Sequence, residues 1–362
     1  MIINQFLKLV DCAKTNLKVK PMIWLTALLV LGFCKEANAQ SVSPVQGGHY
    51  LASFIGVRDM ATPPPGLFVV VYNYRSSTNS FYDRNGDKFS GGSLSNLDPS
   101  LPDINVDINL DTYATVPVIA WGSKKTILGG ARYLAGIAPV IAWADASLVT
   151  EQNGGTIIPE LNQSVSGKLS GFSDLLIFPL GLSWGFEKTD LTFMYSVTAP
   201  TGKYENGGSE NLGLGFWTNQ FQGFGYYYPV ADKSSALMLG LTYEINGEIK
   251  DSDVKPGNRF TLEYGISQYL SERFELGIIG GHNWQISDDK GSDVFWDPSV
   301  RDRKSTLAFT AGYWVWKQRM QLTFKYGFDY GMRQRFKNDA LMLNLTFVTN
   351  ALTGANKKNN TP

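Results

Sequence analysis

The chain has 362 residues, and its 32 basic and 32 acidic side chains balance to a formal net charge of zero. This balance excludes a broadly basic nucleic-acid surface, so no nucleic-acid partner is expected. Aromatic residues reach 13% and glycines number 37, while hydrophobic residues make up 43% of the chain. Only one apolar run approaches the roughly 20 residues of a membrane-spanning helix, which excludes a polytopic helical membrane protein.

That run belongs to the first predicted element, a signal peptide over residues 1–39. Several lysines, the last of them Lys20, precede the apolar run Met22–Phe33. Its length is typical of a signal-peptide core, and the small-residue motif that ends at Ala39 fits a cleavage site. A permanent anchor and a lipoprotein at Cys34 are the alternatives.

Both cysteines of the chain, Cys12 and Cys34, fall within this presequence. The exported chain is therefore expected to have no disulfide framework and no thiol chemistry. Packing or a closed hydrogen-bonded sheet must hold it together.

An N-terminal segment, residues 40–65, comes next and ends in three prolines. The apolar run after Gly66 begins the first predicted strand. Prolines lack a backbone N–H and are tolerated at a rim, before strand pairing begins. The segment is long enough to enter a barrel lumen as a plug, and a position in the periplasm is the alternative.

From Gly66 to Val348 the dominant pattern is period-two alternation, which places alternate side chains on opposite faces of a strand. The clearest case is Gln321–Gly331, where Leu322 and Phe324 lie on one face and Thr323 and Lys325 on the other. Such alternation also suits a soluble β protein, so it does not decide the fold class alone.

The connections between the predicted strands favour a membrane barrel. Tight connections at 187–190, 271–273 and 317–319 alternate with long polar ones at 199–213 and 287–303. Short periplasmic turns and longer outside loops are typical of an outer-membrane barrel. We therefore predict an all-β, transmembrane antiparallel β-barrel of about 12 strands over residues 66–348, with both ends periplasmic and a C-terminal tail over 349–362.

The faces of these strands predict which residues line the lumen, because a charged side chain that faces lipid near mid-membrane is unfavourable, by about 2–4 kcal/mol for a basic one. The predicted lumen-lining residues are Asp107, Asn109, Asp111, Glu244, Thr261, Glu263, Glu275, Thr323, Lys325, Asp329, Asn344 and Thr346. In the first strand, Phe68, Val70, Tyr72 and Tyr74 are expected to face lipid. An apolar inner stripe of Leu67, Val69 and Val71 then faces inward.

Three motifs carry a family resemblance: the entry to the first strand at Pro63–Gly66, the stretch Pro200–Tyr204, and the stretch Tyr243–Gly257. Together with their surroundings they resemble the outer-membrane transporters of the phenol-degradation meta-pathway type. The resemblance runs from about Gly47 to Phe347. It implies a channel for hydrophobic or aromatic compounds in the cell outer membrane, among lipid and lipopolysaccharide.

One departure from the family pattern lies at the C-terminus, where residues 348–362 follow the last strand aromatic, Phe347. A signal for the barrel-assembly machinery that is read at the extreme C-terminus is displaced. Phe347 is then the expected anchor for that machinery.

Catalytic, metal and cofactor chemistry are not expected. The two histidines are His49, interpreted as an ordinary polar contact, and His282. His282 and Asn283 are adjacent in a predicted strand, so they point to opposite faces and cannot form a catalytic dyad. The predicted function is a channel that passes small hydrophobic or aromatic solutes down a gradient, since no energy-coupling motif occurs. The alternatives are a structural or adhesive barrel with a closed lumen and, less favoured, a barrel hydrolase.

Overall fold

The computed structural model describes residues 47–349, apart from 94, 96–98, 156, 158–160, 209 and 318. No helix in this part of the chain is long and apolar enough to cross a membrane. The strands, in chain order, are β1 (Gly66–Tyr82), β2 (Lys88–Phe89), β3 (Gly91–Ser93), β4 (Asp103–Ile127), β5 (Ala131–Ala138), β6 (Ile141–Asn153), β7 (Gln163–Phe172), β8 (Leu175–Gly185), β9 (Thr189–Ala199), β10 (Thr218–Tyr227), β11 (Ser235–Asn246), β12 (Arg259–Tyr269), β13 (Phe274–Gln285), β14 (Arg303–Trp316), β15 (Met320–Arg333) and β16 (Arg335–Val348).

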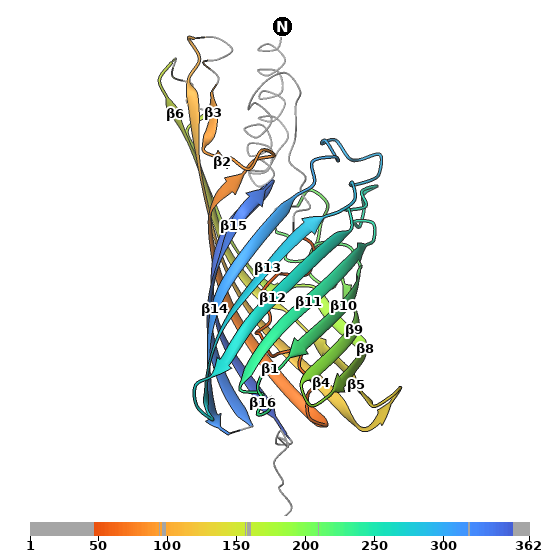
Figure 1. The fold of residues 1–362 in the computed structure, drawn as a ribbon. Helices are drawn as coiled ribbons and strands as arrows, with labels where there is room; N and C mark the ends of the chain where they lie inside the picture. Colours follow the sequence, from red (N-terminus) through yellow and green to blue (C-terminus); the bar gives the residue numbers. More distant parts are fainter. Residues whose placement is uncertain are drawn as a thin grey trace, which may run out of the picture.

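These strands close into a 12-stranded antiparallel barrel, which confirms the predicted fold class (Figure 1). β5 and β6 act as one barrel strand with an interruption at Pro139 and Val140, and β7 and β8 as another with an interruption at Ser173 and Asp174. β1 closes the ring, because it pairs with β16 along one edge and with β4 along the other. Except along the second edge of β7, closure leaves the backbone groups of the described wall paired, which hydrocarbon requires.

Alternation along the strands separates an apolar outer face from a mixed inner face. In β11, Leu237, Leu239 and Leu241 are exposed on the outside, whereas Met238 and Thr242 are buried on the inside. The same outer belt continues around the ring through large exposed apolar side chains. Exposed leucines would be unfavourable in water and are favourable against lipid.

The wall has uneven height. β4 is 25 residues long, whereas β10 has ten. β6 rises with β4 at the end of the barrel that carries the long loops (Figure 1). We call this the long-loop end and the opposite one the short-turn end. β7 pairs with β6, and in the described part of the chain no strand pairs with its second edge.

The long loops between β9 and β14 fold onto each other over the barrel mouth. Phe216, Ile249, Val254 and Trp296 form a buried apolar cluster. The carboxylate of Asp289 accepts hydrogen bonds of 2.8 Å each from the indole N–H of Trp296 and the backbone N–H of Gly257. These loops are therefore an ordered cap with its own small core.

The barrel begins at Gly66 and ends at Val348. The predicted signal peptide with its cleavage site at Ala39, and the predicted tail from residue 350 onward, lie outside the described residues.

Candidate functional site

Residues 47–61, here called the luminal segment, run through the inside of the barrel. Near the short-turn end, the N–H of Thr62 lies 3.2 Å from a carboxylate oxygen of Asp190, close to the start of β9. At the long-loop end, a methyl group added to Gly47 would lie 3.3 Å from the guanidinium of Arg335, the first residue of β16. The segment thus occupies the lumen and does not lie in the periplasm.

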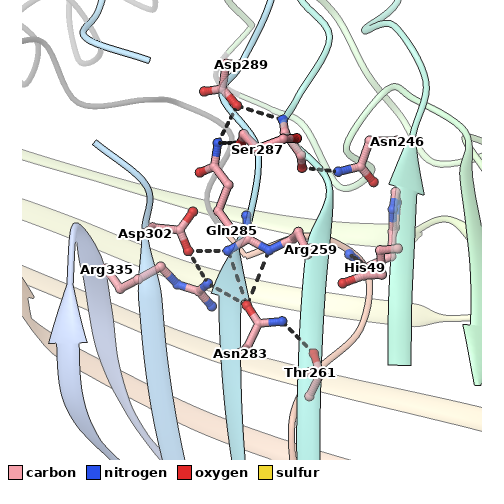
Figure 2. A network of polar contacts seen from close by, with 12 residues as sticks. His49, Asn246, Arg259, Thr261, Asn283, Gln285, Ser287, Asp289, Asp302 and Arg335 are labelled. Carbon is pink, nitrogen blue, oxygen red and sulfur yellow. Dashed lines mark hydrogen bonds and ion pairs between the residues drawn. The ribbon is translucent and has the colours of Figure 1, made fainter. Parts of the chain in front are cut away.

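A buried charged network surrounds the upper end of the segment (Figure 2). Arg335 donates to the carboxylate of Asp302 over 2.7 Å, and Arg259 donates to the same oxygen. Asn283 accepts from Arg259 and Arg335 and donates to Thr261 over 2.7 Å. Asp302 lies just outside β14; burial acts to raise the pKa of its carboxyl, yet the two guanidiniums hold that pKa below its ordinary value.

Two carboxylates of the wall bind the backbone of the segment. Glu244 accepts from the N–H groups of His49 and Tyr50, over 3.0 and 2.9 Å. Glu263 accepts from the N–H of Ser53 over 2.6 Å and from the Tyr50 hydroxyl. Hydrogen bonds to a charged acceptor are stronger than neutral ones, so these glutamates replace the water that the segment loses in the lumen.

His49 fastens the segment to the interruption between β7 and β8. Its Nε2 lies 3.0 Å from Asp174, and its Nδ1 lies 2.8 Å from the Thr218 hydroxyl. Asp174 also accepts from the N–H groups of Gly202 and Leu214. The interruption in the wall is therefore where the segment and a long loop meet.

Lys325 binds the middle of the segment through carbonyl oxygens. Its Nζ lies 2.5 Å from the oxygens of Ser53 and Phe54 and 3.2 Å from that of Ile55. Within the part of the chain that the structure describes, no carboxylate lies within ion-pair distance of this ammonium group. The segment itself supplies the polar groups that solvate the buried cation.

Arg58 and Asp59 anchor the lower end. Arg58 Nε donates to Glu275 over 2.6 Å and to the Ser267 hydroxyl over 2.9 Å. Asp59 accepts from the Tyr72 hydroxyl over 2.7 Å and from the N–H of Gly56 over 2.6 Å. Both side chains reach from the segment to the wall.

Apolar contacts complete the packing on two sides of the segment. Phe54 lies with its ring 5.1 Å from that of Tyr72 and 5.9 Å from that of Tyr74. On the other side Val57 is 4% exposed and joins a buried cluster of Phe224, Tyr226, Tyr228, Met238, Ile279 and Ala308. The remaining space beside Phe54 is a cavity of about 40 Å³. That volume holds a few water molecules.

Most of the predicted lumen residues lie on the inner face of the wall. Glu244, Thr261 and Glu263 are fully buried there, and Glu275 meets Arg58. The others on this face are Thr323, Lys325, Asp329, Asn344 and Thr346.

The prediction is wrong for three of the lumen residues. Asp107, Asn109 and Asp111 lie on the outer face of β4. They share a face with Tyr113 and Trp121, which are 42% and 47% exposed. The physical reason is the length of β4: its upper half stands beyond the apolar belt, where an outward carboxylate meets water and not lipid. The inner face there carries Ile104, Val106, Ile108 and Leu110.

The predicted orientation of β1 is also wrong. Leu67 is 44% exposed and faces outward with Val69 and Val71, whereas Tyr72 is 4% exposed and faces the lumen. Both faces of this strand are apolar, so alternation alone does not set the orientation. The Tyr72 hydroxyl sets it, because it reaches Asp59 inside the barrel.

His282 and Asn283 point to opposite faces, as the strand period predicts. Asn283 is 2% exposed and belongs to the inner network, whereas His282 contacts Tyr264 and Trp284 on the outside. The pair therefore forms no dyad.

Several residues of the site were missed from the sequence. Arg259 lies on the same face as Thr261 and Glu263, so extending the alternation to the start of β12 identifies it. Arg335 begins β16 after a tight turn at Gln334, and Arg58 lies in a segment without any period. No sequence pattern marks those two.

A closed antiparallel barrel with an apolar outer belt and a chain segment inside its lumen defines a β-barrel protein of the Gram-negative outer membrane. Residues 78–345 match the family described as "Putative MetA-pathway of phenol degradation". The chain belongs to this family, in agreement with the resemblance seen in its motifs.

One solved structure shows the same fold, and two others are similar to a lower degree. An outer membrane channel from Pseudomonas putida F1 matches with a TM-score of 0.59 and 18% identity, over 81% of this chain and 99% of that one. The translocator domain of the autotransporter NalP from Neisseria meningitidis matches at 0.43 and 11% identity, over 81% and 92%. A Pseudomonas aeruginosa FadL homologue matches at 0.42 and 11% identity, over 80% and 91%. No curated protein sequence matches.

Proposed function

We propose that this chain is an outer-membrane channel that passes small hydrophobic or aromatic molecules down a concentration gradient, with the luminal segment as its gate. The family description, which names phenol degradation, supports the solute class. The similarity to an outer membrane channel supports the transport role.

The observation that carries the proposal is the chemistry of the inner wall. A water-filled porin has a polar lumen. Here Tyr72, Phe224 and Tyr226 are buried inside the barrel against the segment, next to the charged groups. An apolar solute gains free energy on such a surface once the segment yields its place.

The segment has the properties of a gate and not of a wall strand. Side chains of the wall satisfy its backbone groups, among them Glu244, Glu263 and Lys325. Water can replace each of these partners when the segment leaves. The cavity beside Phe54, about 40 Å³, is too small for an aromatic ring, so a solute that takes this route requires that movement.

The test compares uptake in cells that lack the protein, that carry the intact chain, and that carry a variant without residues 47–61. We expect the intact chain to speed entry of phenol and toluene but not of a small sugar. The shortened variant should pass all three. Heat-modifiable migration on gels checks that each barrel has folded.

The second candidate is a structural barrel with a permanently closed lumen, and the filled lumen favours it. If neither the intact chain nor the shortened variant passes any solute, that candidate stands and the channel proposal fails. We propose no catalytic role; accordingly, His282→Ala should leave solute entry unchanged.

A further inference from the structure

A basic and aromatic patch lies on the outer face of the barrel, at the long-loop ends of β13, β14 and β15. We call it the rim patch; its members are His282, Trp284, Arg303, Tyr330 and Arg333. The strand register places Trp284 beside Arg303 and Arg303 beside Arg333. One row below, His282 lies beside Ser305, and Ser305 beside Tyr330.

The aromatic part of the patch is a continuous surface around His282. The imidazole ring stacks on Trp284 at 5.5 Å and 25°, and lies 6.3 Å from the ring of Tyr330. Its Nδ1 lies 2.7 Å from the Ser305 hydroxyl, which fixes the ring. Flat rings held in this way form a platform for the apolar face of a sugar.

The two arginines of the patch have no carboxylate partner among the described residues. The Nε of Arg333 is buried and makes no hydrogen bond. Two other arginines near the long-loop end are paired, since Arg301 lies 2.9 Å from Asp288 and Arg84 lies 3.4 Å from Asp297. A guanidinium is suited to a phosphate, which it can bind through two parallel hydrogen bonds.

The patch lies directly above the apolar belt. Ile278, Phe309 and Phe324, lower on the same three strands, are between 42% and 48% exposed on the outer face. Tryptophan and tyrosine concentrate where hydrocarbon meets headgroups. Arg303 and Arg333 are therefore at the level of the headgroups of the outer leaflet.

We propose that the rim patch binds the phosphorylated sugar headgroup of an outer-leaflet glycolipid. Arg303 and Arg333 bind its phosphate, and Trp284 with His282 stacks against its sugar ring. The acyl chains continue down the apolar belt below. A protein partner would leave that belt uncovered, whereas a glycolipid covers the belt and the patch together.

The test measures binding of diphosphoryl lipid A to the full-length protein in detergent, by native mass spectrometry. We expect the double variant Arg303→Gln/Arg333→Gln to bind at least about tenfold more weakly than the unaltered chain. The matched control Arg84→Gln/Arg301→Gln removes the same charge from paired arginines and should retain binding. Dephosphorylated lipid A should bind weakly and equally to all three proteins.

An equal loss of lipid A binding in both double variants would mean that only net charge matters, and this would overturn the proposal. Undiminished binding by Arg303→Gln/Arg333→Gln would overturn it as well. Competition by inorganic phosphate alone, at concentrations that match lipid A, would show a phosphate site without a lipid and would also overturn it. Trp284→Ala separates the platform from the charges: it should weaken lipid A binding while leaving heat-modifiable migration unchanged.

Discussion

Arg58 on the luminal segment donates to Glu275 on β13 over 2.6 Å, with side chains that are 17% and 13% exposed. The same guanidinium also reaches the carbonyl oxygens of Lys233 and Ser234 near the short-turn end. This one guanidinium therefore joins the segment to β13 and to the connection between β10 and β11. This contact lies at the lower end of the segment, close to the point where the chain continues into β1.

Breaking the contact between Arg58 and Glu275 should free the segment. Removing one partner of a buried pair leaves the other charge unpaired, and we expect about 1–3 kcal/mol in favour of release for Arg58→Met or Glu275→Gln alone. The double variant should show less than the sum. Single-channel recordings in planar bilayers measure the open fraction.

The matched control for that cycle is the exposed ion pair between Lys317 and Glu272, also at the short-turn end. Exposed pairs contribute little, so Lys317→Met should leave the open fraction as it is. Strict additivity of the Arg58 and Glu275 variants would contradict a direct interaction in the lumen.

Lys325→Met should expose the middle of the segment. Three carbonyl oxygens lose their donor, and unsatisfied buried acceptors are costly. The described residues contain no cysteine, so a single Ala52→Cys substitution reports exposure through its rate of reaction with a membrane-impermeant maleimide. We expect labelling to rise about tenfold or more.

Lys325→Arg should give a smaller rise, because the charge and the donors remain. Thr323→Val, on the same inner face of β15, provides the control and should label like the unaltered chain. Labelling that is equally fast in all four proteins would mean that the segment does not rest on Lys325.

Gly48→Ala should displace the upper end of the segment. Gly48 has φ of +61°, and a methyl group there would lie 2.5 Å from Cδ of Arg259. We expect a cost of about 1–2 kcal/mol from the left-handed backbone, with the clash in addition. The rate of maleimide labelling at Ala52→Cys measures this displacement of the segment.

Gly129→Ala is the comparison for that variant. Its φ is +73°, yet no atom lies within 4 Å of the added methyl group. Gly129→Ala carries the backbone cost without the clash, and it lies in the turn between β4 and β5, at the opposite end of the barrel from Gly48, so labelling should not change. Equal labelling in both variants would argue against close packing at Gly48.

Acid should loosen the network at the long-loop end. Burial acts to raise the pKa of Asp302, but the charges of Arg259 and Arg335 outweigh burial and hold this pKa below its ordinary value. A carboxyl group whose pKa is lower in the folded than in the unfolded state stabilises the folded state at pH values above its unfolded-state pKa. This stabilisation is lost as the pH falls through its folded-state pKa. The open fraction should therefore be flat from about pH 7 to 5 and rise below about pH 4.

Asp302→Asn should remove the part of this acid response that comes from Asp302, and it should already be more open at neutral pH, because two buried guanidiniums then lack their counter-ion. Recordings of both proteins between about pH 7 and 3 provide the comparison. An unchanged acid response in the variant would assign it to other carboxylates.

The barrel could be predicted because its signals are repeated along the chain. In β15 the alternation is unambiguous, since Leu322, Phe324 and Tyr326 oppose Thr323 and Lys325, and the structure has the same two faces. In β1 both faces are apolar, and the deciding contact of Tyr72 with Asp59 is made by a segment that has no period of its own.

The candidate site was harder to predict, because its residues depend on features that do not repeat along the chain. Asp107 and Asp111 obey the rule that charged groups avoid lipid, but a strand of 25 residues extends past the lipid, so the rule no longer selects a face. The route of the luminal segment depends on partners from β11, β12, β13 and β15. Pairings between a strand and an aperiodic segment leave no trace in a single sequence.

The continuity of the luminal segment with β1 has a kinetic consequence. A gate that is part of the same chain cannot diffuse away when it leaves the lumen. Only residues 62–65 separate it from the wall, so its effective concentration at the lumen stays in the millimolar range or above. Reclosure is then a unimolecular step whose rate does not depend on how much protein the membrane contains. In the proposed channel, a passing solute would therefore compete with a ligand that is always present, and each channel would reset itself.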